Sequence, residues 1–266
     1  MNSNYSISVI IPSYNTPEIT KCAALSFIKH FKNTEVIIVE NSNYKWENIK
    51  EDIKIIHAPT LNVGSVANAD GIMQGLKYAT GDFIFTAHSD VFVLPNFYNH
   101  LISLTNNFQL IGTWQQQIRS KALHISGLCV KSDIIRNIDI YPKYLKGGDY
   151  NYDMERYAKN IMEWRNSRIE TDPIDVGDNI TLECRKNNIK TYCMENNINN
   201  QLMCNCYKYK GIAAHYSFLN NKEIYLHKGR LTLYRIEDKA FEKIGMKRRN
   251  GLGKEEEWLN IINDLL

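Results

Sequence analysis

Three short apolar runs, each followed at once by polar residues, constrain the fold of this chain more than any other feature. They are Ile7–Pro12, Glu35–Val39 and Phe83–Phe85. Continuous runs of mainly β-branched and aromatic residues at this length are typical of strands buried on both faces of a parallel sheet. Open α/β sheets bind their ligands beyond the carboxyl ends of such strands. The polar residues after the three runs are therefore the first candidates for a site.

Two helices are predicted between these strands. Thr16-Pro17-Glu18 predicts a helix start, with an N-cap, a proline at the first helical position and an acidic first turn, and the helix ends near His30. Ser65 is predicted to cap a second helix that runs to Ala79. With a short strand at Lys54–His57, the order is β-α-β-β-α-β. This order predicts a doubly wound α/β sheet with right-handed crossovers.

The second half of the chain is less regular. Residues 141–172 contain Gly147-Gly148, five Tyr and Trp164, which fits an insertion lying over a site, a partner surface or an irregular surface excursion. The other elements predicted here are helices at 94–105, 179–186 and 255–266 and strands at 108–113, 124–130 and 191–194.

Length and composition favour one globular domain with an elaborated C-terminal part. The chain has 266 residues and 44% hydrophobic residues, enough for a sizeable core. A net charge of +3 does not indicate a nucleic-acid partner. No apolar run approaches the roughly 20 residues of a membrane span, and Ile7–Ile11 is too short for the core of a signal peptide. We therefore expect a soluble, cytoplasmic protein.

The six cysteines are expected to be reduced thiols in such a compartment. Cys184, Cys193, Cys204 and Cys206 offer a zinc site as an alternative, but they lack the usual pairs spaced by two to four residues.

The run Phe83–Phe85 leads into His88-Ser89-Asp90. In an extended chain, residues two apart point the same way, so His88 and Asp90 could share one cation. Taken alone, the pattern is weak, and a plain strand end followed by a polar loop explains it equally well.

Several further motifs follow one another in a specific order. They are Val9–Asn15, Val39–Ser42, Asn62–Gly64, Ala67–Gly71, Ala79–Ile84, His88–Asp90, Gly127 and Asp175–Asp178. In this order they resemble the nucleotide-sugar glycosyltransferases of the GT-A type, and glycosyltransferase family 2 in particular. The resemblance covers residues 7 to about 190, and His88–Asp90 stands where the family has D-x-D.

The resemblance implies a GT-A fold, a Rossmann-like, mostly parallel sheet with a helical and irregular C-terminal elaboration. Residues 1–215 would form the glycosyltransferase domain, with a nucleotide-sugar half at 1–110 and an acceptor half at 111–215. Residues 216–266 would be an extension packed on the same domain.

The resemblance also implies a nucleotide site at the strand ends. Pro12 and Tyr14 are suited to packing the base, and Glu40 to accepting hydrogen bonds from a base N–H or ribose hydroxyls. We prefer this function for Glu40 because a carboxylate that ends a buried strand needs partners. Asn41 and Asn68 are equally good turn and helix-surface residues. The predicted nucleotide site consists of Pro12, Tyr14, Glu40, Asn41, Asn68, Ser89 and Arg230.

A divalent cation is the cofactor that the resemblance implies, since it can stabilise the charge of the leaving diphosphate. Asp90 is the better ligand. His88 replaces the usual aspartate and suits Mn²⁺ better than Mg²⁺, so Mn²⁺ is the predicted ion and Mg²⁺ the alternative. A late histidine completes the site in several relatives, and here His227 fits that role better than His215, because Gly229 and Arg230 follow it closely.

The activity implied is an inverting hexosyl transfer from a UDP-linked sugar to a hydroxyl of a glycan, a lipid-linked glycan or another surface polysaccharide. Asp178 is the first candidate for the base and Asp175 the second. Charge matching at a helix N-terminus also explains Asp178. The competing hypothesis is a GT-A-like protein that binds nucleotide or glycan without transfer. The basic stretch 241–254 suggests contact with an anionic acceptor or the inner membrane surface, with a solvated helix edge as the alternative, and a homodimer is a further option.

Overall fold

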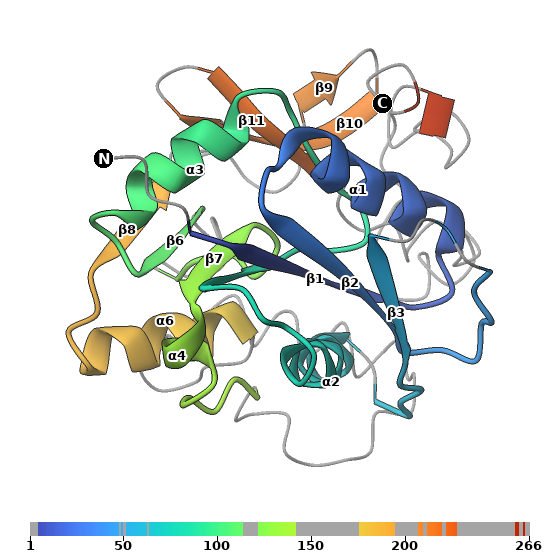
Figure 1. Cartoon of the computed structure of the whole chain (residues 1–266), viewed down its shortest axis with the longest axis horizontal. Helices are drawn as coiled ribbons and strands as arrows, with labels where there is room; N and C mark the ends of the chain where they lie inside the picture. The colour runs from blue at the N-terminus through green and yellow to red at the C-terminus, as the bar shows by residue number, and fades with distance from the viewer. Residues whose placement is uncertain are drawn as a thin grey trace, which may run out of the picture.

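The structure is a computed structural model of the 266-residue chain. It describes residues 5–47, 49, 52–62, 64–113, 122–141 and 176–194, the strands at 207–209, 212–219 and 222–227, and residues 259, 260 and 263. A seven-stranded mixed sheet forms the centre of the described part, as Figure 1 shows.

The central sheet has the strand order β3-β2-β1-β4-β7-β6-β8. Strands β1, β2, β3 and β4 run parallel to one another, and β7 runs antiparallel to both β4 and β6. This confirms the predicted mostly parallel α/β sheet. The strand bounds are β1 Ile7–Ser13, β2 Thr34–Glu40, β3 Ile53–His57, β4 Phe83–Thr86, β6 Leu110–Thr113, β7 Leu128–Lys131 and β8 Thr191–Met194.

Helices cover both faces of this sheet. In Figure 1, α1 (Pro17–His30) and α3 (Phe97–Thr105) lie on one side of the strands. On the other side lie α2 (Gly64–Leu76), α4 (Ser132–Ile135) and α6 (Val176–Lys186).

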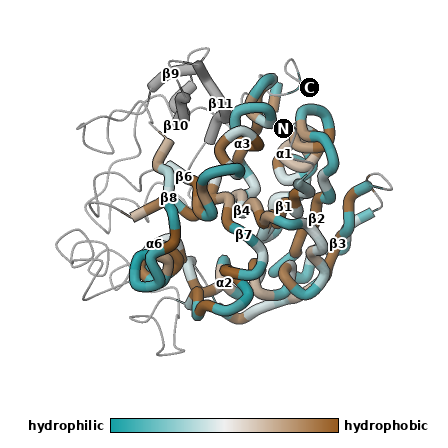
Figure 2. Tube along the Cα trace, turned by 60° about the vertical axis from the view of Figure 1, so that its left-hand side comes forward, coloured by the Kyte–Doolittle hydropathy of each residue, from teal (hydrophilic) through white to brown (hydrophobic). Residues whose placement is uncertain are grey.

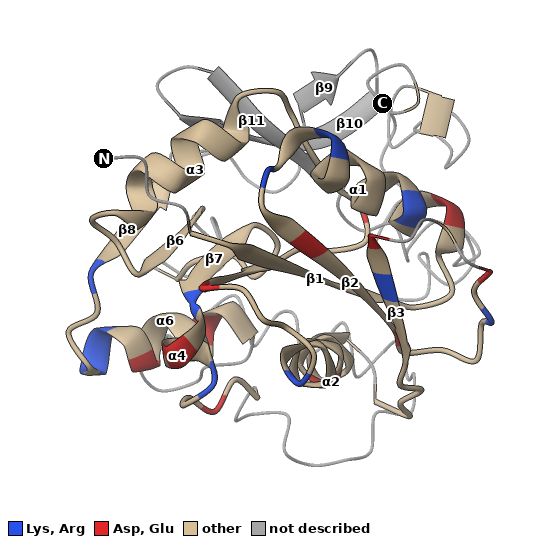
Figure 3. Cartoon of the chain, in the orientation of Figure 1, with Lys and Arg blue, Asp and Glu red and all other residues tan. Residues whose placement is uncertain are grey.

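Two hydrophobic cores result, because successive residues of a strand point to opposite faces. Val9 and Ile11 pack with α1 and α3, whereas Ile10 packs with α2. In Figure 2 the hydrophobic colour follows the central strands, and the hydrophilic colour lies on outer helix turns and loops. Figure 3 places most charged residues on the helices and connections; β2 is an exception, with a glutamate near each end, Glu35 and Glu40.

Helix α1 begins at Pro17 with Thr16 at its N-cap position, both as predicted. Thr16 occupies the N-cap position without a side-chain capping bond. Its hydroxyl lies 3.2 Å from Thr20 Oγ1 and 3.5 Å from Ser13 Oγ instead. The buried hydroxyl cluster at the end of β1 competes for the group that would otherwise cap the helix.

Helix α2 ends at Leu76, three residues before the predicted end at Ala79. The Arg136 guanidinium donates to the carbonyls of Leu76 and Ala79, at 2.6 and 2.7 Å. A side chain 57 or more positions away thus satisfies carbonyls that a helix end leaves free. Propensity within the segment could not indicate this end.

The strand predicted at 124–130 is shorter in the structure, beginning only at Leu128. Gly127 has a φ of +94°, and its amide donates to the Thr86 carbonyl at 2.8 Å. This bend removes His124–Ser126 from the strand and turns them toward the end of β4.

Strand β5 (Val91–Val93) was not predicted, and the helix expected from Leu94 begins at Phe97. β5 belongs to a second sheet, of order β5-β11-β10-β9, with β9 at Tyr207–Tyr209, β10 at Ile212–Leu219 and β11 at Lys222–His227. A three-residue strand whose partner lies more than 130 residues later leaves no local signal. Strand β10 runs through the expected domain boundary at 215/216.

No helix within the described residues is long and apolar enough to cross a membrane. Cys22, Cys129, Cys184 and Cys193 are free thiols, and burial raises the pKa of Cys184 to about 12. Cys204 and Cys206, the other half of the zinc alternative, lie outside the described residues.

Candidate nucleotide and metal site

A fully buried carboxylate organises the ends of β1 and β2. The register of the parallel pair sets Glu40 beside Ser13. Glu40 Oε2 accepts hydrogen bonds from Ser13 Oγ at 3.0 Å and Trp46 Nε1 at 2.8 Å. Glu40 Oε1 accepts from the amides of Asn15 and Ser42, both at 3.0 Å, and from Ser42 Oγ at 2.5 Å. Five donors of the chain itself therefore surround this one side chain.

The expectation that Glu40 needs partners is met inside the protein. Its exposed fraction is 0%, so a nucleotide could reach it only if an internal donor moved. What the geometry does explain is how two loops are held, the one after β1 and the one after β2. Direct contact of Glu40 with a base or ribose stays a prediction.

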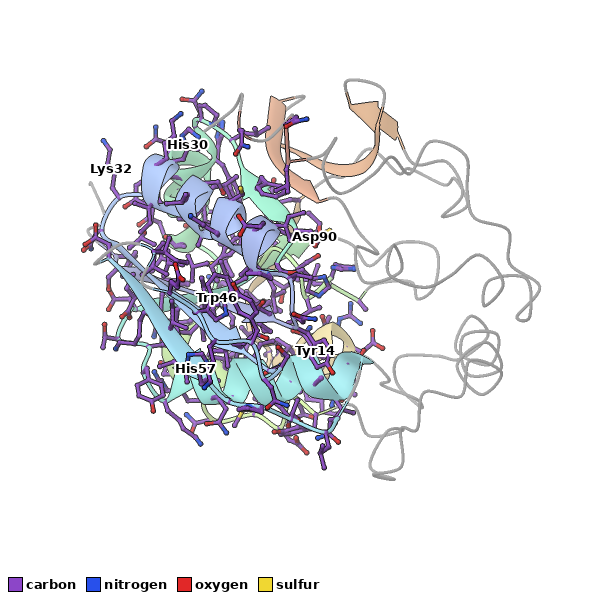
Figure 4. The ribbon with its side chains drawn as sticks, turned by 90° about the vertical axis from the view of Figure 1, so that its right-hand side faces the viewer. Tyr14, His30, Lys32, Trp46, His57 and Asp90 are labelled. Carbon is purple, nitrogen blue, oxygen red and sulfur yellow. The ribbon has the colours of Figure 1, made fainter. Side chains whose placement is uncertain are left out.

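Tyr14 follows β1 and presents its ring to solvent, with 52% of its surface exposed. The next residue, Asn15, has a φ of +52°, a conformation that asparagine tolerates better than most residues. Figure 4 shows Tyr14 and Asp90 toward the same side of the molecule, away from His30 and Lys32 at its other end. An exposed ring at the carboxyl end of β1 is available for stacking.

Pro12 and Asn41 pack against helix α2 at Gly71. A Cβ added at Gly71 would lie 2.8 Å from Pro12 Cβ and 3.0 Å from Asn41 Nδ2, so only glycine allows this approach. Asn41 is buried, and its Nδ2 donates to the Ala67 carbonyl at 2.7 Å. Both residues thus have packing roles, and their predicted nucleotide contacts are not tested by this geometry.

The His88-Ser89-Asp90 segment turns tightly after β4. The Ala87 amide donates to the Ile10 carbonyl at 3.0 Å, and the Val91 amide to the His88 carbonyl at 3.1 Å. His88 and Ser89 are half-buried, whereas Asp90 is buried with 4% of its surface exposed. Asn68 Nδ2 lies 3.4 Å from His88 Nε2, so two predicted site residues from different elements meet here.

His124 lies beside His88 and is not among the residues that the sequence selects for the site. Its ring centroid lies 5.6 Å from that of His88. The Ser126 amide donates to His124 Nδ1 at 3.1 Å, and Ser126 Oγ lies 2.5 Å from the same nitrogen. In the neutral ring an accepting Nδ1 leaves the proton on Nε2. The glycine that directly follows the sequence His124-Ile125-Ser126 is the signal that could have pointed to this bend.

Strand β11 places the backbone of His227, the late histidine predicted as a metal ligand, beside the end of the His88–Asp90 turn. In register, His227 pairs with Val91, which directly follows Asp90. His227 also pairs with His215 on β10. Paired backbones in an antiparallel ladder lie about 5 Å apart, so the backbones of these residues are neighbours. Arg230 lies outside the described residues.

The binding of a cation by His88 and Asp90 stays a prediction. No group of three or more His, Cys, Asp and Glu within the described part is arranged to hold a metal ion. His88 and Asp90 provide one imidazole and one carboxylate, a mixture that suits Mn²⁺ better than Mg²⁺. Oxygens of a bound diphosphate would have to supply further ligands.

Helix α6 carries the predicted base against the segment that holds His124. A Cβ added at Gly177 would lie 2.2 Å from the Leu123 carbonyl oxygen, so the helix start packs directly on that segment. The Leu123 amide donates to Thr181 Oγ1 at 3.0 Å. Asp178 lies in this first turn with an exposed fraction of 0%. Asp175 lies outside the described residues.

Comparison with known proteins agrees with this layout. Residues 8–121 match the family model described as Glycosyl transferase family 2. The resemblance to glycosyltransferase family 2 is confirmed. This segment contains β1 to β6 with both the Glu40 loops and the His88–Asp90 turn. A comparison with curated proteins gave no match.

Several solved structures are similar to part of the chain. S. aureus TarS 1-349 has 16% identity and a TM-score of 0.40, over 53% of this chain and 51% of that one. The mannosyltransferase PcManGT from Pyrobaculum calidifontis, in complex with GDP-Man and Mn²⁺, has 14% identity and a TM-score of 0.40, over 62% and 55%. Glucosyl-3-phosphoglycerate synthase from Mycobacterium tuberculosis has 11% identity and a TM-score of 0.39, over 52% and 60%. The chain thus spans about half the length of these structures.

Proposed function

We propose that the protein is an inverting glycosyltransferase that uses a nucleoside-diphosphate sugar, UDP-linked, and a hydroxyl of a glycan or other surface-polysaccharide acceptor. One observation carries the proposal: within a glycosyltransferase family 2 segment, an exposed aromatic ring and the His88-x-Asp90 turn lie at the carboxyl ends of neighbouring parallel strands. This is the edge at which open α/β sheets bind ligands.

In the proposed reaction, the acceptor oxygen attacks the anomeric carbon and forms a new C–O bond. The bond from that carbon to the diphosphate oxygen breaks, and the diphosphate leaves with the electron pair. The acceptor proton passes to the Asp178 carboxylate, or to Asp175 as the second candidate. A carboxylate in hydrogen-bond reach of the hydroxyl supports such a transfer as the bond forms.

The proposed cation is Mn²⁺, held by His88 and Asp90 together with diphosphate oxygens. When bound, it would neutralise charge that develops on the leaving diphosphate. His227 is the proposed third protein ligand, supported by the register that sets its backbone beside Val91. Binding of Mn²⁺ in the presence of UDP, followed by electron paramagnetic resonance, tests this set without relying on turnover. Unchanged binding in His88→Ala and Asp90→Ala would refute it.

The test of the function combines a hydrolysis assay on nucleotide sugars with the variant Asp178→Asn. General-base catalysis contributes about 10²- to 10⁴-fold, so the variant should lose turnover by that factor while nucleotide affinity stays within about twofold. Asp133→Asn is the matched control, because Asp133 is exposed and pairs only with Lys131 among the described residues. Wild-type turnover in Asp178→Asn would overturn the base assignment.

The competing function is nucleotide or glycan binding without transfer. The complete burial of Asp178 is the observation that favours it, because a base must reach its acceptor. Nucleotide binding without hydrolysis of any donor, with or without Mn²⁺, would establish this alternative.

A further inference from the structure

Asp70 on helix α2 binds two segments that are far apart in the sequence. One carboxylate oxygen, Oδ2, accepts from Thr60 Oγ1 at 2.7 Å and from Asn62 Nδ2 at 2.8 Å. The other, Oδ1, accepts from the Tyr141 hydroxyl at 2.9 Å. The two oxygens therefore hold the segment after β3 and residue 141 at the same time.

The bonds from Thr60 and Asn62 to Asp70 form a first arm, on the side of the site where the nucleotide is proposed to bind. The Thr60 amide donates to the Asn41 carbonyl at 3.0 Å, and the Ala58 amide to the Glu40 carbonyl at 3.0 Å. Residues 58–62 are thereby joined to the end of β2. Asp70 fixes the far end of this segment.

The bond from Tyr141 to Asp70 forms a second arm, which leads to α6, the helix that carries the proposed base. The Tyr141 carbonyl accepts a hydrogen bond from Asn179 Nδ2. Asn179 is buried, with 1% of its surface exposed, and stands next to Asp178 in the first turn of α6. Burial, and then the bond to Asp70, raises the pKa of Tyr141 to about 12, so its hydroxyl remains a donor at neutral pH.

We infer that Asp70 is a positioning residue that couples the nucleotide side of the site to the first turn of α6 through Tyr141 and Asn179. The inference rests on the proposed function for its catalytic consequence, but the coupling itself is a property of the fold. Asp70 contacts neither reactant in this role. It sets the distance between the segment that meets the nucleotide and the helix that presents Asp178.

Two conservative variants act on the two arms separately: one removes the bond of Tyr141 to Asp70, and the other removes that of Thr60 and leaves that of Asn62. Tyr141→Phe keeps the ring and removes only the hydroxyl that binds Asp70. Thr60→Val keeps the side-chain shape and removes the hydroxyl of the nucleotide arm. Tyr141→Phe should lower kcat of transfer about 10- to 100-fold, since small misplacements of a catalytic group have effects of that size, and leave the Kd of UDP within about twofold. Thr60→Val should raise that Kd with a smaller change in kcat.

Hydrogen exchange supplies a readout that needs no activity. Without ligand, Tyr141→Phe and Asp70→Asn should speed amide exchange in α6, whereas Thr60→Val should speed it only around residues 58–62. Asp82→Asn is the matched control: it makes the same chemical change to a carboxylate that accepts bonds from the Ser6 amide and hydroxyl, both at 2.9 Å. It should leave exchange in α6 unchanged.

The outcomes separate this inference from the proposed function. Unchanged α6 exchange in Tyr141→Phe, or an equal increase in Asp82→Asn, overturns the coupling whatever the activity. Absence of transfer in the wild type refutes the proposed function, and the exchange pattern still decides the coupling.

Discussion

Replacing Glu40 by Gln should destabilise the protein by about 2–4 kcal/mol, although the two side chains have nearly the same shape. The carboxylate accepts five hydrogen bonds and donates none. An amide can accept only through its oxygen, and its NH₂ group must face donors that cannot all reverse.

The orientation of the new amide sets the magnitude. With NH₂ at the Oε2 position, the Ser13 hydroxyl can turn and accept, but the Trp46 indole N–H meets another donor. With NH₂ at the Oε1 position, it would face two backbone amides, those of Asn15 and Ser42. The first orientation is therefore preferred. It leaves one unsatisfied donor, worth about 1–3 kcal/mol, and weakens the remaining bonds, which lose their charged acceptor.

A double-mutant cycle isolates the free-energy cost of placing the new NH₂ group against the Trp46 indole N–H. Trp46→Phe removes the indole N–H and keeps an aromatic ring. In that background Glu40→Gln should cost about 1–2 kcal/mol less than in the wild type, because the donor–donor contact is gone. Urea unfolding followed by far-UV circular dichroism measures all four proteins, and unchanged m-values keep them comparable.

Glu35→Gln is the matched control at the other end of the same strand. Glu35 accepts from Ser8 and Thr80 and is half-exposed, so water can replace lost bonds and the cost should be smaller. A cost below about 1 kcal/mol for Glu40→Gln, or the same cost with and without the Trp46 indole, would falsify this account of the loop ends.

Three further predictions concern stacking, packing and acid stability. Tyr14→Ala should weaken UDP binding about 5- to 150-fold, since aromatic stacking on a base is worth about 1–3 kcal/mol; calorimetric titration measures this, and Tyr78→Ala, at a ring with similar exposure, should leave it unchanged. Gly71→Ala should lower the free energy of unfolding by about 1–3 kcal/mol, because its Cβ would press on β1 at 2.8 Å; wild-type stability in urea unfolding would contradict it. Hydrogen bonds from the Ser6 amide and hydroxyl lower the pKa of Asp82, so the stability that Asp82 contributes is complete above about pH 4 and is lost as the pH falls through its lower folded pKa. Asp82→Asn should therefore reduce the dependence of the free energy of unfolding on pH below about pH 4. The same dependence in Asp82→Asn and Asp133→Asn would count against this assignment.

The central part of the fold was predictable because its signals are local. Ile7–Pro12 and Glu35–Val39 are continuous apolar runs that fit strands buried on both faces, and the structure places them as neighbouring parallel strands. Pro17 marked the start of α1 correctly. What failed depended on distant partners: β5 forms because β11 pairs with it, and α2 ends where Arg136 binds its carbonyls.

In the candidate site, too, some features follow from local sequence and others depend on distant contacts. Sequence order was sufficient to place Tyr14, His88 and Asp90 after neighbouring parallel strands, whose carboxyl ends meet at one edge of the sheet. It could not show that the partners of Glu40 are internal, since they come from loops whose paths depend on the register of β1 and β2. Nor could it select His124, which reaches His88 only through the bend at Gly127.

By itself, the sequence determined the class of fold, the strand ends that carry the site and the resemblance to glycosyltransferase family 2, because strand burial and helix starts are written in neighbouring residues. The tertiary structure alone decided which polar groups are already paired and which elements are tied together. Glu40 became the centre of two loops and Asp70 the link between α2, residues 58–62 and α6. The bonds that Asp70 accepts from Thr60, 10 positions away, and from Tyr141, 71 positions away, cannot be read from local patterns, since each requires that the chain between the partners has already folded.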